Sequence, residues 1–425
     1  MSTRTPTPSS AKTARGAARA GEFARTLTTS AWRRVRQESL DVILLAGTTL
    51  ILVIIGVTMV FSSSTVTSLV ETGSPFASLG KQALFAFLGI GLMFVLSSRP
   101  ERWFMRFAWL ALGITSLLQL LVVATPLGIT VAGNTNWISI AGVQFQPSEF
   151  MKVALVIWLG MMTTRKQDSL DDFRLGVLPI LIGAAVPMLL VVIGGDLGTV
   201  GIMAGFVFLA LVLIGIPMRH FLVPGLVVAA GAVLMAVSSS NRMARILSFV
   251  DRSKDANDYL SSGWQVQHGQ FALANGGLFG VGIGNSTAKW SWLPAADNDF
   301  IFAIIGEELG LIGAVLVLAL FGVLCVALVR VFMHADTLFG RTATAAVLVW
   351  IMAQAVANIA VVLGIIPVLG VPLPLVSSGG TALVSNLAAI GVVLSVARAS
   401  AHDRPIPERS ASSVPAARAV PVRRR

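Results

Sequence analysis

The feature that most constrains this chain is a series of apolar stretches, each close to the roughly 20 residues that a helix needs to cross a bilayer. Backbone groups in hydrocarbon find no water, so such stretches have to form helices that satisfy their own hydrogen bonds. Only 12% of the residues are charged, against about 25% in soluble domains. We therefore predict an all-α polytopic membrane protein with ten transmembrane helices. The predicted spans lie near residues 42–62, 81–98, 106–125, 149–164, 176–194, 197–216, 220–238, 300–329, 343–364 and 382–397.

Basic residues are distributed unevenly between the two sides of this predicted bundle. The side that holds both termini carries 24 of the 31 Lys and Arg residues. Cytoplasmic loops of membrane proteins show this excess, so we place both termini in the cytoplasm. The net charge of +11 could suggest nucleic acid as a partner, but the distribution of the basic residues indicates a membrane surface instead. Anionic membrane lipids are the expected partners of the basic tails.

The chain divides into three regions. Residues 1–40 and 399–425 are basic and poor in bulky apolar side chains, which predicts disordered cytoplasmic tails. Residues 41–398 form the transmembrane domain. Within it, residues 239–298 form a large extracytoplasmic loop between the seventh and eighth helices. The single cysteine excludes an internal disulfide, and the four scattered histidines predict no metal centre.

Polar residues gather in segments on the predicted outer side. In "QPSEFMK", Ser148 is a candidate N-cap, and Glu149 and Lys152 share one helix face, where they can pair with each other or bind a charged head group. In "GGDLGT", Asp196 is a candidate site residue or a simple helix cap.

Basic residues recur in the large outer loop. Arg242 and Arg245 lie on a predicted amphipathic helix at the membrane interface and are candidates for binding phosphates. Lys289 is a third candidate, and it follows the glycines of the stretch "GGLFGVGIGNSTAKW". The glycines there allow either a close backbone approach to a ligand or simple loop flexibility.

A proline-rich outer segment precedes the last span. Its "SSGGT" run contains Ser377, Gly379 and Gly380, whose backbone N–H groups could hold an anion such as phosphate. A serine cap of the last helix is the alternative interpretation.

Asp299 is the candidate catalytic residue, because it lies where the outer loop becomes the eighth helix. The alternative is that it only caps this helix. Glu307 and Glu308 follow about two turns later, where at most one can face a polar interior. A reaction outside the cell has no nucleotide fuel, so its substrate has to carry its own activation. A sugar linked to a lipid diphosphate meets this demand, with one carboxylate taking the proton of the attacking hydroxyl.

Five segments resemble, in order and spacing, the SEDS family of shape, elongation, division and sporulation proteins. They are "GNTNWISIAGVQFQPSEFMK", "GGDLGT", "GWQVQHGQFALANGGLFGVGIGNS", "KWSWLPAADNDFIFAIIGEELGLIG" and "GIIPVLGVPLPLVSSGGT". The resemblance covers roughly residues 40–398 and is greatest to the division-type FtsW branch. The family often has Glu and His where this chain has Ala295 and Asp297.

The resemblance implies a ten-helix SEDS fold and a peptidoglycan glycosyltransferase that polymerises lipid II on the outer face of the bacterial cytoplasmic membrane. It implies Asp299 as the essential acid, with a class B penicillin-binding protein and other division proteins as partners at the septum. No cofactor is required by the sequence, and a divalent cation such as Mg²⁺ or Mn²⁺ is left open. A rod-elongation polymerase of the RodA type, a flippase for lipid-linked sugars and a scaffold for the transpeptidase stay open as alternatives.

Overall fold

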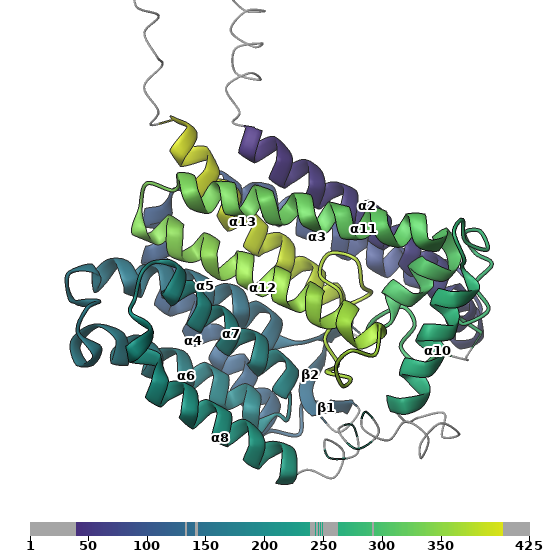
Figure 1. Ribbon diagram of the computed structural model, residues 1–425, viewed down its shortest axis with the longest axis horizontal. Coiled ribbons are helices and arrows are strands. Elements are labelled where there is room, and N and C mark those ends of the chain that lie inside the picture. Colours follow the sequence, from purple (N-terminus) through teal and green to yellow (C-terminus); the bar gives the residue numbers. More distant parts are fainter. Residues whose placement is uncertain are drawn as a thin grey trace, which may run out of the picture.

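The computed structural model describes residues 40–131, 134–140, 143–238, 262–290 and 293–402, together with residues 243, 245, 247 and 249. Every predicted span corresponds to a helix in this part of the chain, and the helices pack into one elongated bundle (Figure 1). The helices are α2 (Leu40–Thr72), α3 (Ala77–Ser97), α4 (Glu101–Ala124), α5 (Pro147–Arg165), α6 (Leu178–Ile193), α7 (Leu197–Leu213), α8 (Leu222–Ser238), α10 (Ser262–Asn275), α11 (Ile301–His334), α12 (Leu338–Val362) and α13 (Gly380–His402). Short helical turns occupy Gln167–Ser169, Phe173–Val177 and Met218–Phe221.

The predicted helical membrane fold is confirmed, although the count of ten spans is not matched one for one. In the described residues, eight helices are long and apolar enough to cross a membrane. Helix α7 is apolar but shorter, with 17 residues. Helix α5 has 19 residues and buries Glu149 and Lys152 among its apolar side chains. The polar residues of α5 therefore lie within the bundle and not in a loop.

Helices α12 and α13 form the centre of the bundle (Figure 1). Nearly all of α13 is buried, and it packs closely on α3 and α5. Glycine permits this approach, because a Cβ at Gly391 would lie only 2.7 Å from the Met93 carbonyl oxygen. Small residues at such crossings let helix backbones pack directly in a membrane, where no hydrophobic effect drives helices together.

Helix α11 is broken at Gly310, where the sequence predicts a continuous helix. Gly310 has φ of 69° and ψ of −168°, a conformation that suits only glycine. The glycine-rich stretch before α11 inserts into the break and supplies the missing backbone hydrogen bonds. These bonds run from the N–H groups of Val281 and Gly282 to the carbonyls of Glu307 and Glu308, and from those of Leu311 and Ile312 to the carbonyls of Gly277 and Leu278.

This insertion explains the glycines of residues 276–284. A Cβ at Gly276 would overlap the Gly306 carbonyl, and one at Gly280 would overlap the Glu308 carbonyl. The glycines thus let the loop approach the backbone of α11, and neither the predicted ligand approach nor simple flexibility is needed to explain them. Four backbone groups beside the break thus regain partners, as irregular backbone at membrane depth requires.

The segment before α5 forms a small sheet that the sequence did not predict. Strands β1 (Gly128–Val131), β2 (Asn134–Ile140) and β3 (Val143–Phe145) pair antiparallel in that order. Asn136 on β2 donates a hydrogen bond from Nδ2 to the Gly194 carbonyl at 2.9 Å, which ties the sheet to the α6–α7 turn. The predicted N-cap at Ser148 is wrong, because Gln146 holds that position and Pro147 begins α5. Proline suits the first helical position, where its missing N–H would be unpaired in any case.

The two ends of the described chain lie at the same end of the bundle (Figure 1). There Asp41 near the start of α2 accepts hydrogen bonds from Arg330 Nε at 2.6 Å and His334 Nδ1 at 2.8 Å, both near the end of α11. The sheet, α10 and the start of α11 lie at the opposite end, which is the end predicted to face outward.

Candidate functional site

Asp299 lies just before α11 and does not cap it. The N-cap position belongs to Phe300, and no side chain bonds to the free N–H groups of the first turn. The Asp299 side chain is half-buried, and its Oδ1 is shielded from solvent without a hydrogen-bond partner in the described residues. Burial raises the pKa of Asp299 to about 6, with Arg245 opposing the shift and Asp297 and Asp196 adding to it. The capping interpretation therefore fails, and a carboxylate with one oxygen unbonded among the described residues lies at the end of the bundle that is predicted to face outward.

A buried amide fixes the backbone of Asp299. Asn358 on α12 donates from Nδ2 to the carbonyls of Asp299, at 2.8 Å, and of Val371, at 2.9 Å. These two bonds settle the orientation of the amide, and its Oδ1 is then a buried acceptor with no partner in the part of the chain described. The start of α11 and the proline-rich segment are thereby joined at one side chain.

Ser377 makes a second connection between the same two segments. Its hydroxyl donates to the Asn298 carbonyl at 2.7 Å and accepts from the Leu373 N–H at 2.8 Å. Next to it, the Ser378 N–H donates to the Asp297 carbonyl at 3.0 Å. Ser377 therefore positions backbone beside Asp299 and is not a cap of α13.

Two residues near Asp299 adopt a left-handed backbone conformation. Among the described residues, Ala295 (φ 54°) and Leu375 (φ 65°) are the non-glycine residues with positive φ. Each such residue costs on the order of 1–3 kcal/mol, and such strain gathers at functional sites. One lies on each of the two segments that meet at Asp299, so strain and connecting hydrogen bonds coincide here.

Arg245 and Asp299 approach each other across Gly370. A Cβ built on Gly370 would lie 3.8 Å from an Arg245 guanidinium nitrogen and 3.9 Å from Asp299 Oδ2. The missing side chain at Gly370 leaves the space in which the cation and the acid face one another. Arg242, the other arginine predicted on this helix, lies outside the described residues.

Asp196 does cap its helix, as one of its two interpretations predicted. Its Oδ1 accepts from the Thr199 N–H at 2.9 Å, and its Oδ2 accepts from the Thr199 hydroxyl at 2.7 Å and from Gln146 Nε2 at 3.2 Å. Burial raises the pKa of Asp196, and Glu149 contributes to the rise while Lys152 opposes it. Asp196 is thus a structural cap that also lies within electrostatic range of Asp299 and of the charges on α5.

Glu149 and Lys152 form a buried ion pair, as one of their two interpretations predicted, with 2.9 Å between Lys152 Nζ and Glu149 Oε1. Lys152 also donates to Gln354 Oε1 at 3.3 Å, and its ammonium lies 4.7 Å from the centre of the Trp350 ring. Ser385 on α13 donates to Glu149 Oε2 at 3.0 Å. Buried charges need such partners, because an unpaired one is very costly in an apolar interior.

Three predicted phosphate-binding residues have structural roles. Lys289 lies 3.6 Å from Glu308 Oε1 and donates to the Gly284 carbonyl, so it pairs within the α11 cluster. A Cβ at Gly380 would overlap the Phe85 ring, and one at Gly379 would lie 3.1 Å from the Ala382 Cβ. Gly380 therefore allows α13 to start against α3, whereas the predicted role of both glycines as an anion cradle stays a prediction.

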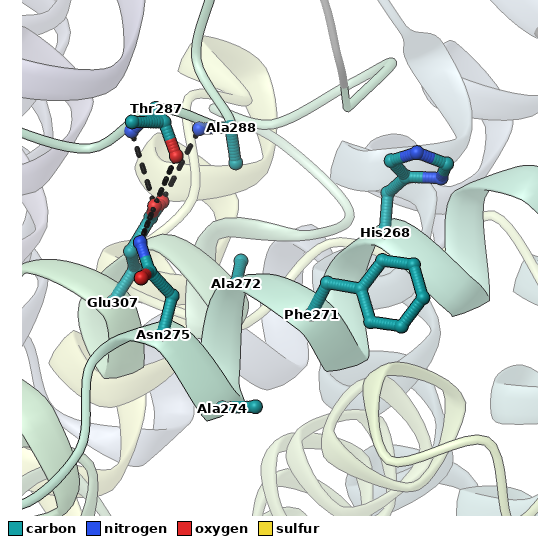
Figure 2. Close-up of a pocket in the computed structure, with 8 residues that line it drawn as sticks. All are labelled: His268, Phe271, Ala272, Ala274, Asn275, Thr287, Ala288 and Glu307. Atoms are coloured by element: carbon teal, nitrogen blue, oxygen red, sulfur yellow. Dashed lines mark hydrogen bonds between the residues drawn. The ribbon is translucent and has the colours of Figure 1, made fainter.

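Glu307 and Glu308 hold the inserted loop in place. Glu307 accepts hydrogen bonds from Asn275 Nδ2, from the Thr287 N–H and hydroxyl, and from the Ser286 hydroxyl. Figure 2 shows the bonds from Asn275 and Thr287. Glu308 accepts from the Ser62 hydroxyl at 2.7 Å. Both acids are therefore engaged with partners, where the sequence allowed only one to face a polar interior.

Sequence reasoning missed the amides of α12. Gln354 and Asn358 are four residues apart on one helical face, and both are buried. Gln354 joins the proline-rich segment through Nε2 and the Pro372 carbonyl at 2.9 Å, as Asn358 does through Val371. Two amides at helical spacing in an apolar span were the signal, because polar side chains within membrane helices face the bundle interior.

Comparisons with known proteins place the chain. A family model described as cell cycle protein, FTSW_RODA_SPOVE, matches residues 42–402. The chain belongs to this family. Stage V sporulation protein E of Bacillus subtilis is 36% identical over 360 residues, which cover 85% of this chain and 98% of that protein. A probable peptidoglycan glycosyltransferase FtsW of Mycobacterium tuberculosis is 36% identical over 349 residues, covering 82% of this chain and 66% of the relative.

Solved structures agree with the fold of the FTSW_RODA_SPOVE family. A chain in a peptidoglycan synthase complex that coordinates polymerization and crosslinking superposes with a TM-score of 0.65 and 26% identity, covering 83% of this chain and 96% of that one. These matches confirm the predicted SEDS family and the predicted class of division-type peptidoglycan glycosyltransferases.

Proposed function

We propose that this chain polymerises lipid II into glycan strands on the outer face of the membrane, with Asp299 as the general base. The observation that carries the assignment is the buried, unpaired Oδ1 of Asp299 at the predicted outer end of the bundle. Family membership supplies the reaction class, and the site supplies one acid with a carboxylate oxygen that no described residue bonds, which leaves it able to take the proton of an attacking sugar hydroxyl.

The pKa of about 6 suits this role. Near pH 7 most Asp299 side chains are ionised and able to accept a proton, while the carboxylate is still more basic than an ordinary aspartate. The acceptor hydroxyl gives its proton to Asp299 as its oxygen bonds to the anomeric carbon of the donor sugar. The bond from that carbon to the diphosphate oxygen breaks, and the configuration at the anomeric carbon inverts.

The leaving lipid diphosphate takes the electron pair of the broken bond and needs positive charge nearby. Arg245 is the best candidate, because its guanidinium lies beside Asp299 across Gly370. Lys152 is a weaker candidate, since it is already engaged by Glu149, Gln354 and the Trp350 ring. Stabilising this developing charge is commonly the largest single contribution to catalysis.

A divalent cation fits this site only together with the substrate. Within the described residues no group of three His, Cys, Asp or Glu side chains could hold a metal ion. The unpaired oxygens of Asn298, Asp299 and Asn358 supply one carboxylate and two amide ligands at most. Mg²⁺ is often bound by one or two carboxylates plus substrate phosphates. Mg²⁺ held by Asp299 and the diphosphate would add positive charge at the leaving group.

The proposal extends to partners and location. We propose a class B penicillin-binding protein as the crosslinking partner and the division septum as the site of action, with both termini cytoplasmic. The similarity to a chain of a synthase complex that joins polymerization and crosslinking supports the first point. Both described chain ends lie at the end of the bundle away from the start of α11, which supports the proposal that both termini are cytoplasmic (Figure 1).

A polymerisation assay with purified protein and lipid II, with and without the transpeptidase and with and without Mg²⁺, tests the assignment. Asp299→Ala and Asp299→Asn should abolish glycan formation while the variants still fold and still bind the transpeptidase. Normal polymer from either variant would refute Asp299 as the base. Lipid translocation without polymer from the wild type would favour a flippase instead.

A further inference from the structure

A cavity of about 760 Å³ opens beside α11 that the proposed reaction does not use. Residues of α10, of the inserted loop and of α11 line it, and Figure 2 shows them arranged around one open space. Its volume lies in the range of small-molecule sites. Glu307 in its wall is about two helical turns from the start of α11, so the cavity lies roughly 10 Å from Asp299 along the helix axis.

The side chains of the cavity favour a neutral ligand. Among the described residues that line it there is no Lys or Arg, so these residues offer a diphosphate no counter-charge. The one acid, Glu307, already accepts from Asn275, Ser286 and Thr287, so a cation would find its oxygens engaged. An acyl chain would bury Asn275 Oδ1, which accepts no hydrogen bond from the described residues, and burying an unpaired amide oxygen costs free energy.

One wall of the cavity is aromatic and is held in place by neighbouring rings. His268 stacks on Trp264 with 3.8 Å between ring centres, and Phe271 meets His268 edge-on at 5.6 Å. Phe271 is nevertheless 57% exposed, so its ring is presented to the open space. The π-face of an aromatic ring attracts the partly positive C–H groups of a saccharide ring.

The opposite wall offers hydrogen bonds. Asn275 donates from Nδ2 to Glu307, which fixes the amide, and none of the described residues donates to its Oδ1. Thr287 adds a hydroxyl, and three alanines supply methyl surface that suits N-acetyl groups. A saccharide ring, which has a C–H face and polar edges, matches a cavity in which an aromatic wall faces an amide and a hydroxyl.

We propose that this cavity is a saccharide subsite that holds the glycan strand during polymerisation. The inference rests on the proposed function, because only a polymerase has such a product. Holding the strand near Asp299 keeps it at high effective concentration between transfers, which lengthens the chains without changing the chemistry of each step.

The test uses the full-length protein and two measurements. The first is the affinity for a lipid-free peptidoglycan tetrasaccharide by calorimetry, and the second is the length distribution of glycan made from lipid II. Phe271→Ala should weaken tetrasaccharide binding about tenfold and shorten the chains, with the initial rate near that of the wild type. Phe271→Trp should restore both properties. Ala274→Trp, which fills the cavity, should act as Phe271→Ala does.

Phe279→Ala is the matched control, because Phe279 is 80% exposed and does not line the cavity. It should leave both measurements unchanged. Polymer of unchanged length and unchanged tetrasaccharide affinity in all variants would overturn the subsite and leave the proposed function standing. Loss of transpeptidase binding with unaltered tetrasaccharide affinity would show a protein contact and would also overturn it. A wild type that makes no polymer would refute the proposed function itself.

Discussion

Replacing Asp299 by Asn should stabilise the protein while it abolishes the reaction. The pKa of Asp299 rises from 3.8 to about 6, chiefly because burial disfavours the charged form. Each pKa unit corresponds to about 1.36 kcal/mol, so ionised Asp299 costs folding up to about 3 kcal/mol near pH 7. Water reaches the half-buried side chain and screens this cost, so we expect a gain of about 1–2 kcal/mol.

The stability gained by Asp299→Asn over the wild type depends on pH. Between pH 3.8 and about 6 the folded state holds the Asp299 proton while the unfolded state has lost it, so wild-type stability falls as pH rises. The advantage of Asp299→Asn should therefore be complete above pH 6 and shrink towards pH 4. Unfolding of detergent-purified protein, followed at pH 4.5, 6 and 7.5 (chosen to bracket the two pKa values), measures it.

Asp172 provides a control, because replacing it by Asn should destabilise the protein and not stabilise it. It is exposed, and backbone hydrogen bonds from Leu175 and Arg174 hold its pKa below the usual value. Asp172→Asn should therefore lose stability at neutral pH, with the difference shrinking as pH falls below the ordinary aspartate range. If Asp299→Asn proved no more stable than the wild type at pH 7.5, Asp299 would not be a destabilised carboxylate, and the reasoning from its burial would be wrong.

Three further outcomes follow from the structure. The rate of polymerisation should fall about tenfold per pH unit below about pH 6. Arg245→Gln should shift this fall in rate to higher pH, because Arg245 lowers the pKa of Asp299 and its loss would raise that pKa. Gly310→Ala should destabilise by about 1–3 kcal/mol or more, since Gly310 has positive φ; unchanged thermal unfolding would contradict the broken α11. Lys152→Ala should cost about 3–5 kcal/mol by leaving Glu149 buried and unpaired, whereas the double change Glu149→Gln with Lys152→Met should recover most of it in the same unfolding assay.

The sequence predicted the positions of the helices because hydropathy records a backbone constraint that no tertiary contact overrides. It also predicted the Glu149–Lys152 pair, since residues three apart on a helix share a face. The same local reasoning could not predict the break at Gly310, whose partners lie about 30 residues earlier in the chain.

The candidate site was predictable only in part, for the same reason. Asp299 was a candidate because it lies at the start of a helix, and the family resemblance singled it out as the essential acid, but its neighbours come from distant segments. Asn358 reaches Asp299 across 59 residues, and nothing in its local sequence points to that partner. Lys289 was assigned to phosphate because a base after a glycine-rich loop suggests it, whereas Glu308 is 3.6 Å away in the fold.

The acids at the start of α11 differ in how completely they are hydrogen-bonded. This difference distinguishes the acids with a structural role from the proposed general base. Glu307 accepts from three side chains and the Thr287 backbone, and Glu308 accepts from Ser62 and pairs with Lys289. The bonds of these two acids are spent on holding the inserted loop. Asp299 keeps one buried oxygen unbonded among the described residues, although donors lie close enough to bond its backbone. A fold that bonds Glu307 and Glu308 but leaves one oxygen of Asp299 unbonded among the described residues bears a cost in stability, and substrate binding is the process that can offset it.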